Sequence, residues 1–319
     1  MAGIKDIAKM AGCSISTVSY ALNGSPKVTE ETRARILEIA KKLEYVPNGA
    51  ARMLRARETK IIGCYLGDYS GSFYGRLLKG IREYLNDQGY ELIVCSGDKS
   101  RRLLQEKMMD GALILDATFT DEDLMQLADS GHKMVLLDRE LNHEHIRTVL
   151  LNNALGATLA VEQLLKREIK HLCLVTGPPG SYDGSLRVYA ALDLLNSKGF
   201  KNVHLLDGDF TKESGYAAAG TIEKLGFDEP VGVFCLNDEM AIGIYDYFEK
   251  TDVSIGKDIF VIGFDNTEIA NYIKPELTSI DYSTTRWGRI ASEKLLALID
   301  EQPVTSEQIN VKLKRGGSC

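Results

Sequence analysis

The sequence lacks the features that mark several large classes of protein. No apolar run approaches the roughly twenty residues that a membrane-spanning helix needs. The six cysteines are widely spaced and include no Cys-x-x-Cys pair, and the amino terminus does not follow the pattern of a secretory signal, a basic stub followed by an apolar core and a cleavage site. We therefore expect a soluble cytoplasmic protein with reduced, mostly buried thiols and no membrane partner.

Motifs of the common enzyme classes are also missing. The chain has no Gly-x-Ser-x-Gly elbow, P-loop, Gly-x-Gly-x-x-Gly fingerprint or His-Glu-x-x-His motif. The loop Gly177-Pro-Pro-Gly180 is rich in glycine but lacks the Lys-Ser/Thr of a phosphate cradle. His132, His143 and His145 cluster in the sequence, and we interpret them as solvated loop residues, not as metal ligands. We expect no catalytic residues, no metal and no cofactor.

The first residues show two short helical patterns separated by a glycine. Apolar residues recur at helical spacing within 4–11 and again within 18–22, and Gly12 can adopt the left-handed turn that a β-carbon disfavours. The outward positions of the second stretch offer hydroxyls and a phenol in place of Lys/Glu pairs, which suits contact with base edges in a DNA major groove. These positions are Ile15, Ser16, Thr17 and Tyr20. An ordinary helical hairpin has the same spacing, so this segment alone leaves both interpretations open.

A third helical pattern follows Thr29, a capping residue with two carboxylates after it, and Pro47 ends the small domain. The alanine-rich run over 49–57 is too short to form a helix alone in water. It carries three arginines and a leucine, a composition that suits folding on DNA with an apolar wedge in the minor groove. The residues expected to contact DNA are Arg52, Leu54 and Arg55.

Charge is distributed unevenly along the chain. Residues 1–60 hold eleven Lys/Arg against six Asp/Glu, which leaves 27 basic and 39 acidic residues of the chain's 38 and 45 for the rest. A basic head is attracted to phosphates while an acidic body is repelled by the duplex. The charge distribution therefore favours DNA binding through the head alone.

After Lys60 the pattern changes to short apolar runs that alternate with helical stretches. The predicted strands are 61–66, 92–95, 112–115, 134–137, 172–176, 231–235 and 260–263. This alternation predicts parallel sheets with helices on both faces. The series divides near Asn153, so we expect an α/β fold of two similar lobes, with a ligand in the cleft at the carboxyl ends of the strands.

Polar and aromatic side chains follow five of these strands. They are Phe73, Tyr74, Asp138, Arg139, Arg187, Asn237 and Asp265. Carboxylates, guanidiniums and an amide can engage adjacent hydroxyls in paired hydrogen bonds, while rings cover the C–H faces of a sugar. Any one of these residues alone would fit a loop cap or a surface ion pair. Their recurrence at five strand ends predicts a polyhydroxylated ligand.

These motifs resemble the LacI/GalR family of bacterial transcription regulators over essentially the whole chain. The head carries Ile-Lys-Asp-Ile-Ala, Ser-x-Ser-Thr-Val-Ser, Leu-Asn-Gly-Ser-Pro-Lys-Val and Tyr-Val-Pro-Asn, and the body is similar to periplasmic sugar-binding proteins of the ribose type. The body motifs are Leu-Asp138-Arg139, Arg187, Asn237-Asp-Glu-Met-Ala and Gly-Phe-Asp265-Asn. The resemblance implies a homodimer on operator DNA, with paired hinge helices that place Leu54 in the minor groove and an effector between the lobes. We include Asn23 among the DNA-binding residues.

We expect the helix-turn-helix domain over 1–46, the hinge helix and linker over 47–60 and the effector-binding core over 61–319. Within the core, the predicted lobe 1 covers about 61–154 and 283–308, and lobe 2 about 155–282 and 309–319. The chain departs from the family at three places. Tyr20 stands where many members have arginine, the segment between Cys95 and Gly111 is about two helical turns shorter, leaving 99–109 for a helix, and Asn152-Asn153 replaces Asp-Asn and receives no predicted role.

The function most consistent with these features is that of a repressor of carbohydrate-utilisation genes controlled by a small sugar. Two alternatives stay open: a catabolite-type regulator whose main signal is a partner protein, and a purine-responsive regulator. A sugar-transport component is disfavoured by the helical head. The sequence leaves open whether the ligand releases DNA or strengthens binding, and whether the assembly is a dimer or a tetramer.

Overall fold

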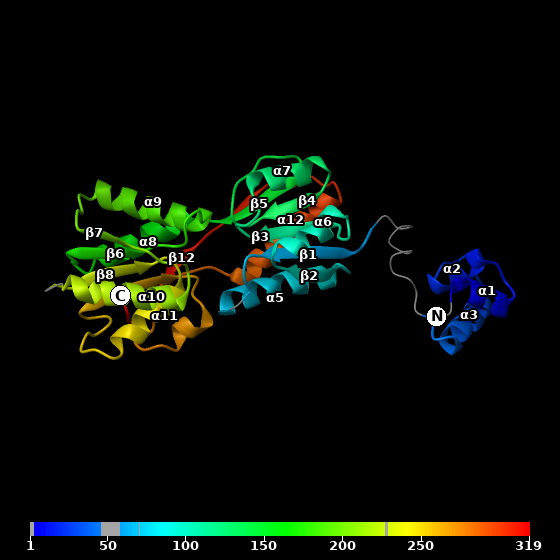
Figure 1. Cartoon of the computed structure of the whole chain (residues 1–319), viewed down its shortest axis with the longest axis horizontal. Coiled ribbons are helices and arrows are strands. Elements are labelled where there is room, and N and C mark those ends of the chain that lie inside the picture. The colour runs from blue at the N-terminus through cyan, green and yellow to red at the C-terminus, as the bar shows by residue number, and fades with distance from the viewer. Residues whose placement is uncertain (1–2, 46–57, 70, 227–228) are drawn as a thin grey trace. The chain divides into compact units, whose positions relative to one another are not determined.

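The computed structural model describes residues 3–45, 58–69, 71–226 and 229–319. The chain divides into two compact units, Met1–Thr59 and Lys60–Cys319. Among the described helices, none is long and apolar enough to cross a membrane. Figure 1 labels the elements of both units.

The first unit is a bundle of three helices, α1 (Ile4–Ala11), α2 (Ile15–Leu22) and α3 (Glu30–Lys42). Gly12 ends α1 with φ 61°, in the left-handed region predicted for it. The hydroxyls of Ser14 and Thr29 accept hydrogen bonds from the backbone at the starts of α2 and α3. The apolar faces of the helices meet in a core of its own, formed by Ile7, Ala8, Ala11, Val18, Ala21, Val28, Ile36 and Ala40. The predicted helix-turn-helix is confirmed.

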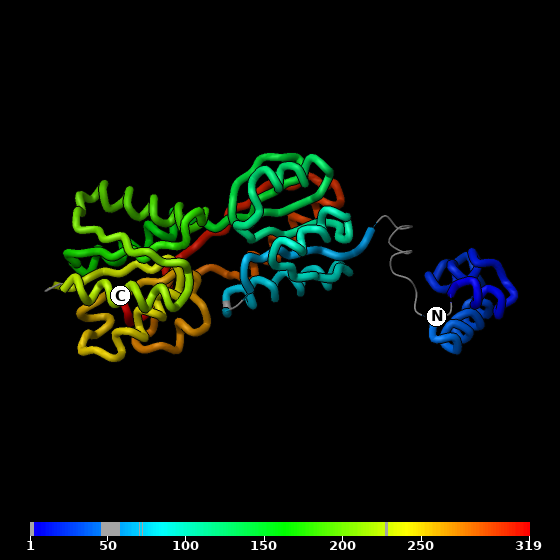
Figure 2. The backbone as a smooth tube through the Cα atoms, in the orientation of Figure 1, coloured from blue at the N-terminus to red at the C-terminus, as the bar shows by residue number. Residues whose placement is uncertain are grey.

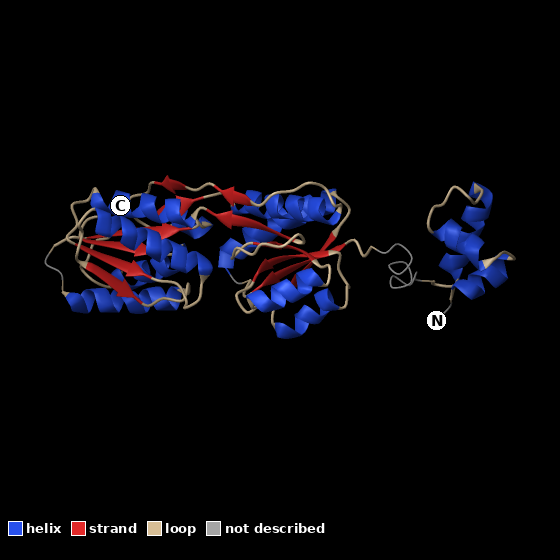
Figure 3. Ribbon diagram, turned by 90° about the horizontal axis from the view of Figure 1, so that it is seen from above, coloured by secondary structure: helices blue, strands red, loops and turns tan. Residues whose placement is uncertain are grey.

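The second unit begins with a six-stranded sheet, which we call lobe 1. Its strands are β1 (Ile61–Leu66), β2 (Glu91–Cys95), β3 (Gly111–Leu115), β4 (Lys133–Leu136), β5 (Ile146–Leu151) and β11 (Glu307–Ile309), in the order β11-β5-β4-β3-β1-β2. All neighbours are parallel. The helices that cover this sheet include α5 (Gly71–Asp87), α7 (Asp121–Asp129) and α12 (Thr284–Ile299), and helices lie on both faces (Figure 3).

A second six-stranded sheet forms lobe 2. Its strands are β6 (His171–Val175), β7 (Val203–Leu206), β8 (Val231–Cys235), β9 (Ile259–Phe264), β10 (Thr278–Asp281) and β12 (Lys312–Lys314), in the order β12-β10-β9-β8-β6-β7. Only the β10–β12 pair is antiparallel. Its helices include α8 (Asn153–Leu165), α9 (Tyr182–Ser197), α10 (Lys212–Leu225) and α11 (Asp238–Phe248). The predicted fold of two parallel-sheet lobes is confirmed.

The chain passes between the lobes three times: from β5 to α8, from β10 to α12 and from β11 to β12 (Figure 2). Each crossover is short, and the last two run close to the first turn of α12. Because both sheets are parallel, the carboxyl ends of their strands carry the loops that hold the polar residues of the predicted site.

Two local predictions are wrong. The helix expected over 99–109 is reduced to a short 3-10 turn, Asp98–Ser100, and to α6 (Arg101–Gln105), because Lys107 takes φ 55° and Met109 turns into the core beside Tyr65.

The expectation of solvated histidines is wrong for His132, whereas His143 and His145 are half-buried. His132 is buried, the Nδ1 of His145 lies 2.8 Å from the carbonyl oxygen of Ala128, and the Nε2 of His143 lies 3.3 Å from Asp129 Oδ1. They pack around the carboxyl end of α7 because the segment that leads into β5 lies against that end of the helix.

Candidate functional site

The candidate DNA-binding face is the outer side of α2. Ile15 and Tyr20 are both 41 % exposed, and Ser16 is exposed as well. Val18, on the opposite side of the helix, is fully buried, so α2 presents a polar and aromatic face with a fixed orientation. A polar and aromatic face of this kind can contact base edges in a major groove.

Two of the predicted DNA-binding residues also stabilise α2. The Thr17 hydroxyl lies 2.8 Å from Ser14 Oγ, and Thr17 is half-buried. Asn23 donates from Nδ2 to the carbonyl oxygen of Ser19 at 2.8 Å. The ammonium of Lys27 lies over the Tyr20 ring, 5.2 Å from its centroid, which adds a positive charge next to the exposed phenol. The hinge residues Arg52, Leu54 and Arg55 lie outside the described residues, and their roles stay predictions.

The candidate effector site is built around Arg187, a buried side chain of lobe 2. Arg187 projects from α9 and is 4 % exposed. Its Nε donates to Asn153 Oδ1 at 2.9 Å, and one terminal nitrogen donates to the carbonyl oxygen of Leu236 at 2.5 Å. The guanidinium stacks on Phe264, 3.6 Å from the ring centroid. These contacts leave little rotational freedom, so the remaining N–H groups have fixed directions.

Asn153 and Asp183 complete this cluster. Asn153 is 1 % exposed and donates from Nδ2 to Asp183 Oδ1 at 2.6 Å, while its oxygen accepts from Arg187. Burial raises the pKa of Asp183, and Arg187 and Asn153 oppose that rise. Neither Asn153 nor Asp183 was predicted. The only sequence signal for them is their position in the first turns of α8 and α9, which come after the carboxyl ends of β5 and β6.

Asp265 follows β9 in a strained turn with φ 106°. Its Oδ1 accepts a hydrogen bond from the Tyr282 hydroxyl at 2.7 Å. Burial raises the pKa of Asp265 to about 6, and the nearby charge of Arg187 and the bond from Tyr282 limit the rise. Asp265 and Arg187 therefore belong to one network, as their predicted joint role requires.

Aromatic rings approach this network from lobe 1. Phe73 and Tyr74 lie in the first turn of α5 with ring centroids 4.9 Å apart at 83°, and Phe73 lies 6.3 Å from the buried Trp287. Burial raises the pKa of Tyr74 to about 12, helped by the charges of Asp68, Asp265, Asp116 and Asp138. The Tyr74 hydroxyl thus lies among carboxyl groups of both lobes.

Asp138 and Arg139, which follow β4, form a bidentate ion pair with both nitrogen–oxygen distances at 3.1 Å. Arg139 also donates to the carbonyl oxygens of Phe119 and Asp116, at 2.6 and 3.0 Å. Its donors are largely used within lobe 1, so Arg139 positions Asp138. Burial raises the pKa of Asp138 in spite of this partner.

Asn237 caps α11, accepting from the Met240 N–H at 3.0 Å and donating to the carbonyl oxygen of Phe210 at 2.8 Å. One donor and one acceptor of its amide are therefore engaged in holding the loop of Phe210, whose ring packs on Gly177.

The structure brings Phe73, Tyr74, Asp138, Arg187 and Asp265 into one electrostatically connected site, whereas Arg139 and Asn237 are turned mainly to their own lobes. Carboxyl groups outnumber guanidiniums, and both guanidiniums already have internal partners. Such a site can accept hydrogen bonds from many hydroxyls and stack a ring, and it repels an anion.

Two family models match the sequence. The model described as bacterial regulatory proteins, lacI family, matches residues 3–48, and the model of a periplasmic binding protein-like domain matches residues 161–319. The HTH-type transcriptional repressor PurR of Vibrio cholerae is 32 % identical over 319 residues, with 95 % of this chain and 93 % of that protein covered.

Solved structures of similar proteins include regulators of the LacI family. A sugar-binding transcriptional regulator of the LacI family from Enterococcus faecalis is 46 % identical, with a TM-score of 0.78, 82 % of this chain and 98 % of that chain covered. The lac repressor dimer bound to operator and the anti-inducer ONPF is 22 % identical, with a TM-score of 0.86 and coverage of 99 % and 98 %. This second likeness shows the fold alone.

Proposed function

Because the chain belongs to the LacI family of bacterial regulatory proteins, we propose that this DNA-binding regulator is a repressor of carbohydrate-utilisation genes controlled by a small neutral sugar. The sugar binds in the cleft between the lobes. The protein acts as a homodimer on operator DNA, and α2 of each copy reads the bases of one half-site.

The observation that carries the sugar proposal is the network of Arg187, Asn153, Asp183 and Asp265. It offers fixed donors and acceptors on one side of the cleft, while Tyr74 and Asp138 of lobe 1 face it. A ligand with several adjacent hydroxyls can pair with both lobes at once and so favour one lobe angle. The likeness to the sugar-binding regulator of Enterococcus faecalis supports the same ligand class.

Support for the DNA-bound dimer comes from the exposed face of α2 and from the operator-bound lac repressor dimer with the same fold. The hinge proposal, in which Leu54 enters the minor groove between Arg52 and Arg55, rests on the sequence.

A thermal-shift screen of the full chain against pentoses, hexoses, disaccharides and purine bases tests the ligand class. Hits are titrated while the fluorescence of Trp287, the single tryptophan, is followed, because its ring lies near Phe73 and Tyr282. We expect at least one neutral sugar to give a saturable response that Arg187→Ala abolishes. The exposed Arg289, replaced by alanine, is the matched control and should leave the response unchanged.

The similarity to PurR supports a second candidate, a purine-responsive regulator. A buried guanidinium stacked on an aromatic ring also suits a planar base. A response to purine bases and to no sugar would favour this candidate. A response to neither class, with intact operator binding, would favour regulation by a partner protein.

A further inference from the structure

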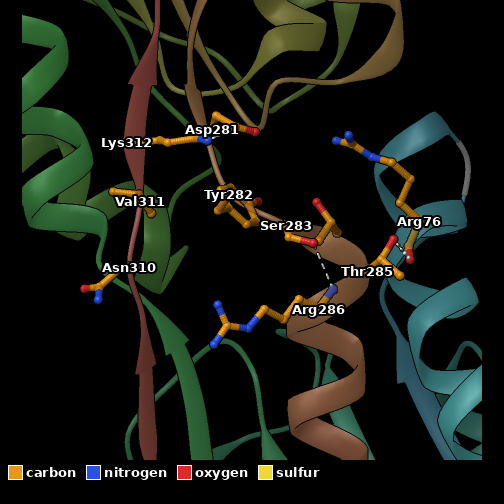
Figure 4. A pocket seen from close by; sticks show the side chains of 10 residues that line it. Arg76, Asp281, Tyr282, Ser283, Thr285, Arg286, Asn310, Val311 and Lys312 are labelled. Carbon is orange, nitrogen blue, oxygen red and sulfur yellow. Dashed lines mark hydrogen bonds and ion pairs between the residues drawn. The ribbon is translucent and has the colours of Figure 1, made fainter.

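A pocket lies beside the crossovers and shares only Tyr282, the hydrogen-bond donor to Asp265, with the network around Arg187. It has a volume of about 500 Å³ and is lined by residues 281–286, residues 310–312 and Arg76 (Figure 4). None of the residues predicted to bind the effector lines it. It is bounded by two of the three segments that connect the lobes and by α5 of lobe 1.

Positive charge predominates in this hinge pocket. Arg76, Arg286 and Lys312 line it together with one carboxylate, that of Asp281. Asp281 is already paired, since Lys312 Nζ lies 3.2 Å from its Oδ2 and Asn266 Nδ2 donates to its Oδ1 at 2.9 Å. The Arg286 side chain extends from the first turn of α12 toward the segment between β11 and β12 that carries Asn310 (Figure 4). Within the described chain, its guanidinium makes no hydrogen bond and no ion pair.

Unused donors accompany these charges. The pocket lies at the amino end of α12, a helix of 16 residues, where the backbone dipole favours an anion. Thr284, which lines the pocket and is 2 % exposed, has a hydroxyl without a hydrogen-bond partner among the described residues. The buried Nε of Arg76 also lacks a partner there. Buried polar groups are rarely left unpaired, so these atoms point to a ligand that supplies acceptors.

We propose that the hinge pocket binds a phosphate-bearing small molecule. A phosphate group has several acceptor oxygens and negative charge, which match Arg286, Lys312, Arg76 and the start of α12. The effector cleft has the opposite character, because carboxyl groups predominate there. The hinge pocket and the effector site therefore select ligands of different charge.

Arg76 connects the hinge pocket to the effector cleft. Its two terminal nitrogens donate to the carbonyl oxygens of Asp265 and Asn266, both at 3.0 Å, so an arginine of lobe 1 holds the turn of lobe 2 that carries Asp265. An anion in the hinge pocket contacts this arginine and two crossovers at the same time. Occupancy of the hinge pocket is therefore coupled to the angle between the lobes. This coupling rests on the proposed function, whereas anion binding itself does not.

Isothermal titration calorimetry of the full chain with inorganic phosphate and with ribose 5-phosphate tests the proposal. Sodium chloride keeps the ionic strength constant, because simple screening otherwise changes with phosphate concentration. We expect saturable binding that Arg286→Gln weakens by about tenfold or more, since a charged hydrogen-bond partner is lost. Arg289→Gln, on the same helix but outside the hinge pocket, should bind like the wild type.

Two results would overturn the proposal. The first is equal phosphate affinity of the Arg286→Gln and Arg289→Gln proteins, which would assign any binding to the basic residues of the first unit. The second is loss of ribose 5-phosphate binding in Arg187→Ala with full binding in Arg286→Gln, which would place the anion in the effector cleft. A failed sugar screen has no bearing on either comparison, so the two proposals can be judged separately.

Discussion

At the scale of single residues, burial controls the ionisation of two carboxyl groups of lobe 2, those of Asp238 and Asp265. Asp238 is fully buried and accepts from the Thr267 N–H and the Ser279 hydroxyl, both at 2.6 Å. Burial, and next the charge of Asp265, raises the pKa of Asp238 to about 7. The unfolded chain loses this proton near pH 4, so between about pH 4 and 7 the folded protein binds more protons. Its contribution to stability is therefore greatest at low pH and is lost as pH rises through about 7.

We predict that Asp238→Asn removes this pH dependence. Urea unfolding at pH 5.5 and 7.5, followed by Trp287 fluorescence, measures the free energy of unfolding of the second unit at each pH. When the pH is lowered from 7.5 to 5.5, the free energy of unfolding of the wild type should rise by about 1 to 2 kcal/mol more than that of the variant. Asp193→Asn, at an exposed position of α9, serves as the control. A variant that retains the wild-type difference would show that Asp238 ionises normally in the folded protein.

The exposed phenol of Tyr20 should determine base preference. A phenol donates to or accepts from one base edge, whereas arginine makes a bidentate contact with guanine. Tyr20→Arg should therefore shift one position of each half-site toward guanine by about 1 to 3 kcal/mol. Binding-site selection with both proteins decides this, because an identical consensus would mean that α2 does not present residue 20 to the bases.

Single residues also show where sequence reasoning stops. Arg187 and Asp265 were predictable as site candidates because each follows a predicted strand, Asp265 directly and Arg187 after the glycine-rich loop 177–180. Asn153 was not, because its role depends on Arg187 and Asp183, which lie 34 and 30 residues further along the chain. The hydrogen-bond partners of Arg139 and Asn237 could not be predicted either, since they are backbone carbonyl groups of other loops, those of Phe119 and Phe210.

At the scale of elements, close packing against α5 fixes the position of the first turns of α12, the helix that follows the crossover from β10. A β-carbon on Gly80 would lie 1.9 Å from the carbonyl oxygen of Thr285, and one on Gly288 would lie 2.4 Å from that of Leu77. Since backbone atoms cannot move aside as a flexible side chain can, both glycines are required for this approach.

Gly80→Ala should accordingly destabilise the core by about 1 to 3 kcal/mol. Gly75→Ala, in the same helix, meets no atom within 4 Å and should stabilise it by roughly 0.5 to 1 kcal/mol. Thermal unfolding of the two variants gives the comparison, and equal melting temperatures would show that α12 can shift without cost.

Strands with continuous apolar runs were predictable, whereas short polar ones were not. Ile61–Leu66 and Val231–Cys235 appear where the sequence predicts them, because each is buried by helices on both faces. Thr278–Asp281 is also buried, yet its polar sequence gives no such signal. It is a strand because β9 and β12 pair with both of its edges, and β12 returns from the end of the chain.

At the scale of the whole molecule, the core is two sheets joined by three short crossovers, and the hinge pocket lies beside two of them. Arg187 and Asp265 belong to lobe 2, whereas Tyr74, Asp138 and Arg76 belong to lobe 1. A ligand that contacts both sets favours one lobe angle over another, and binding energy is thereby converted into a conformational preference. The predicted lobe boundaries lie near residues 154, 282 and 308, close to the three crossovers, whereas the pairing of β11 and β12 with distant strands could not be predicted.

The central claim is that a ligand in the cleft controls DNA binding. The most direct measurement is operator affinity with and without a saturating concentration of the sugar found in the screen, for the wild type and for Arg187→Ala. We predict that the sugar changes wild-type affinity by about 5- to 150-fold, the usual range of coupling between two sites. The variant should bind the operator equally well without sugar and show no change with it. An unchanged wild-type affinity at saturating sugar, or an equal response of the variant, would contradict the account.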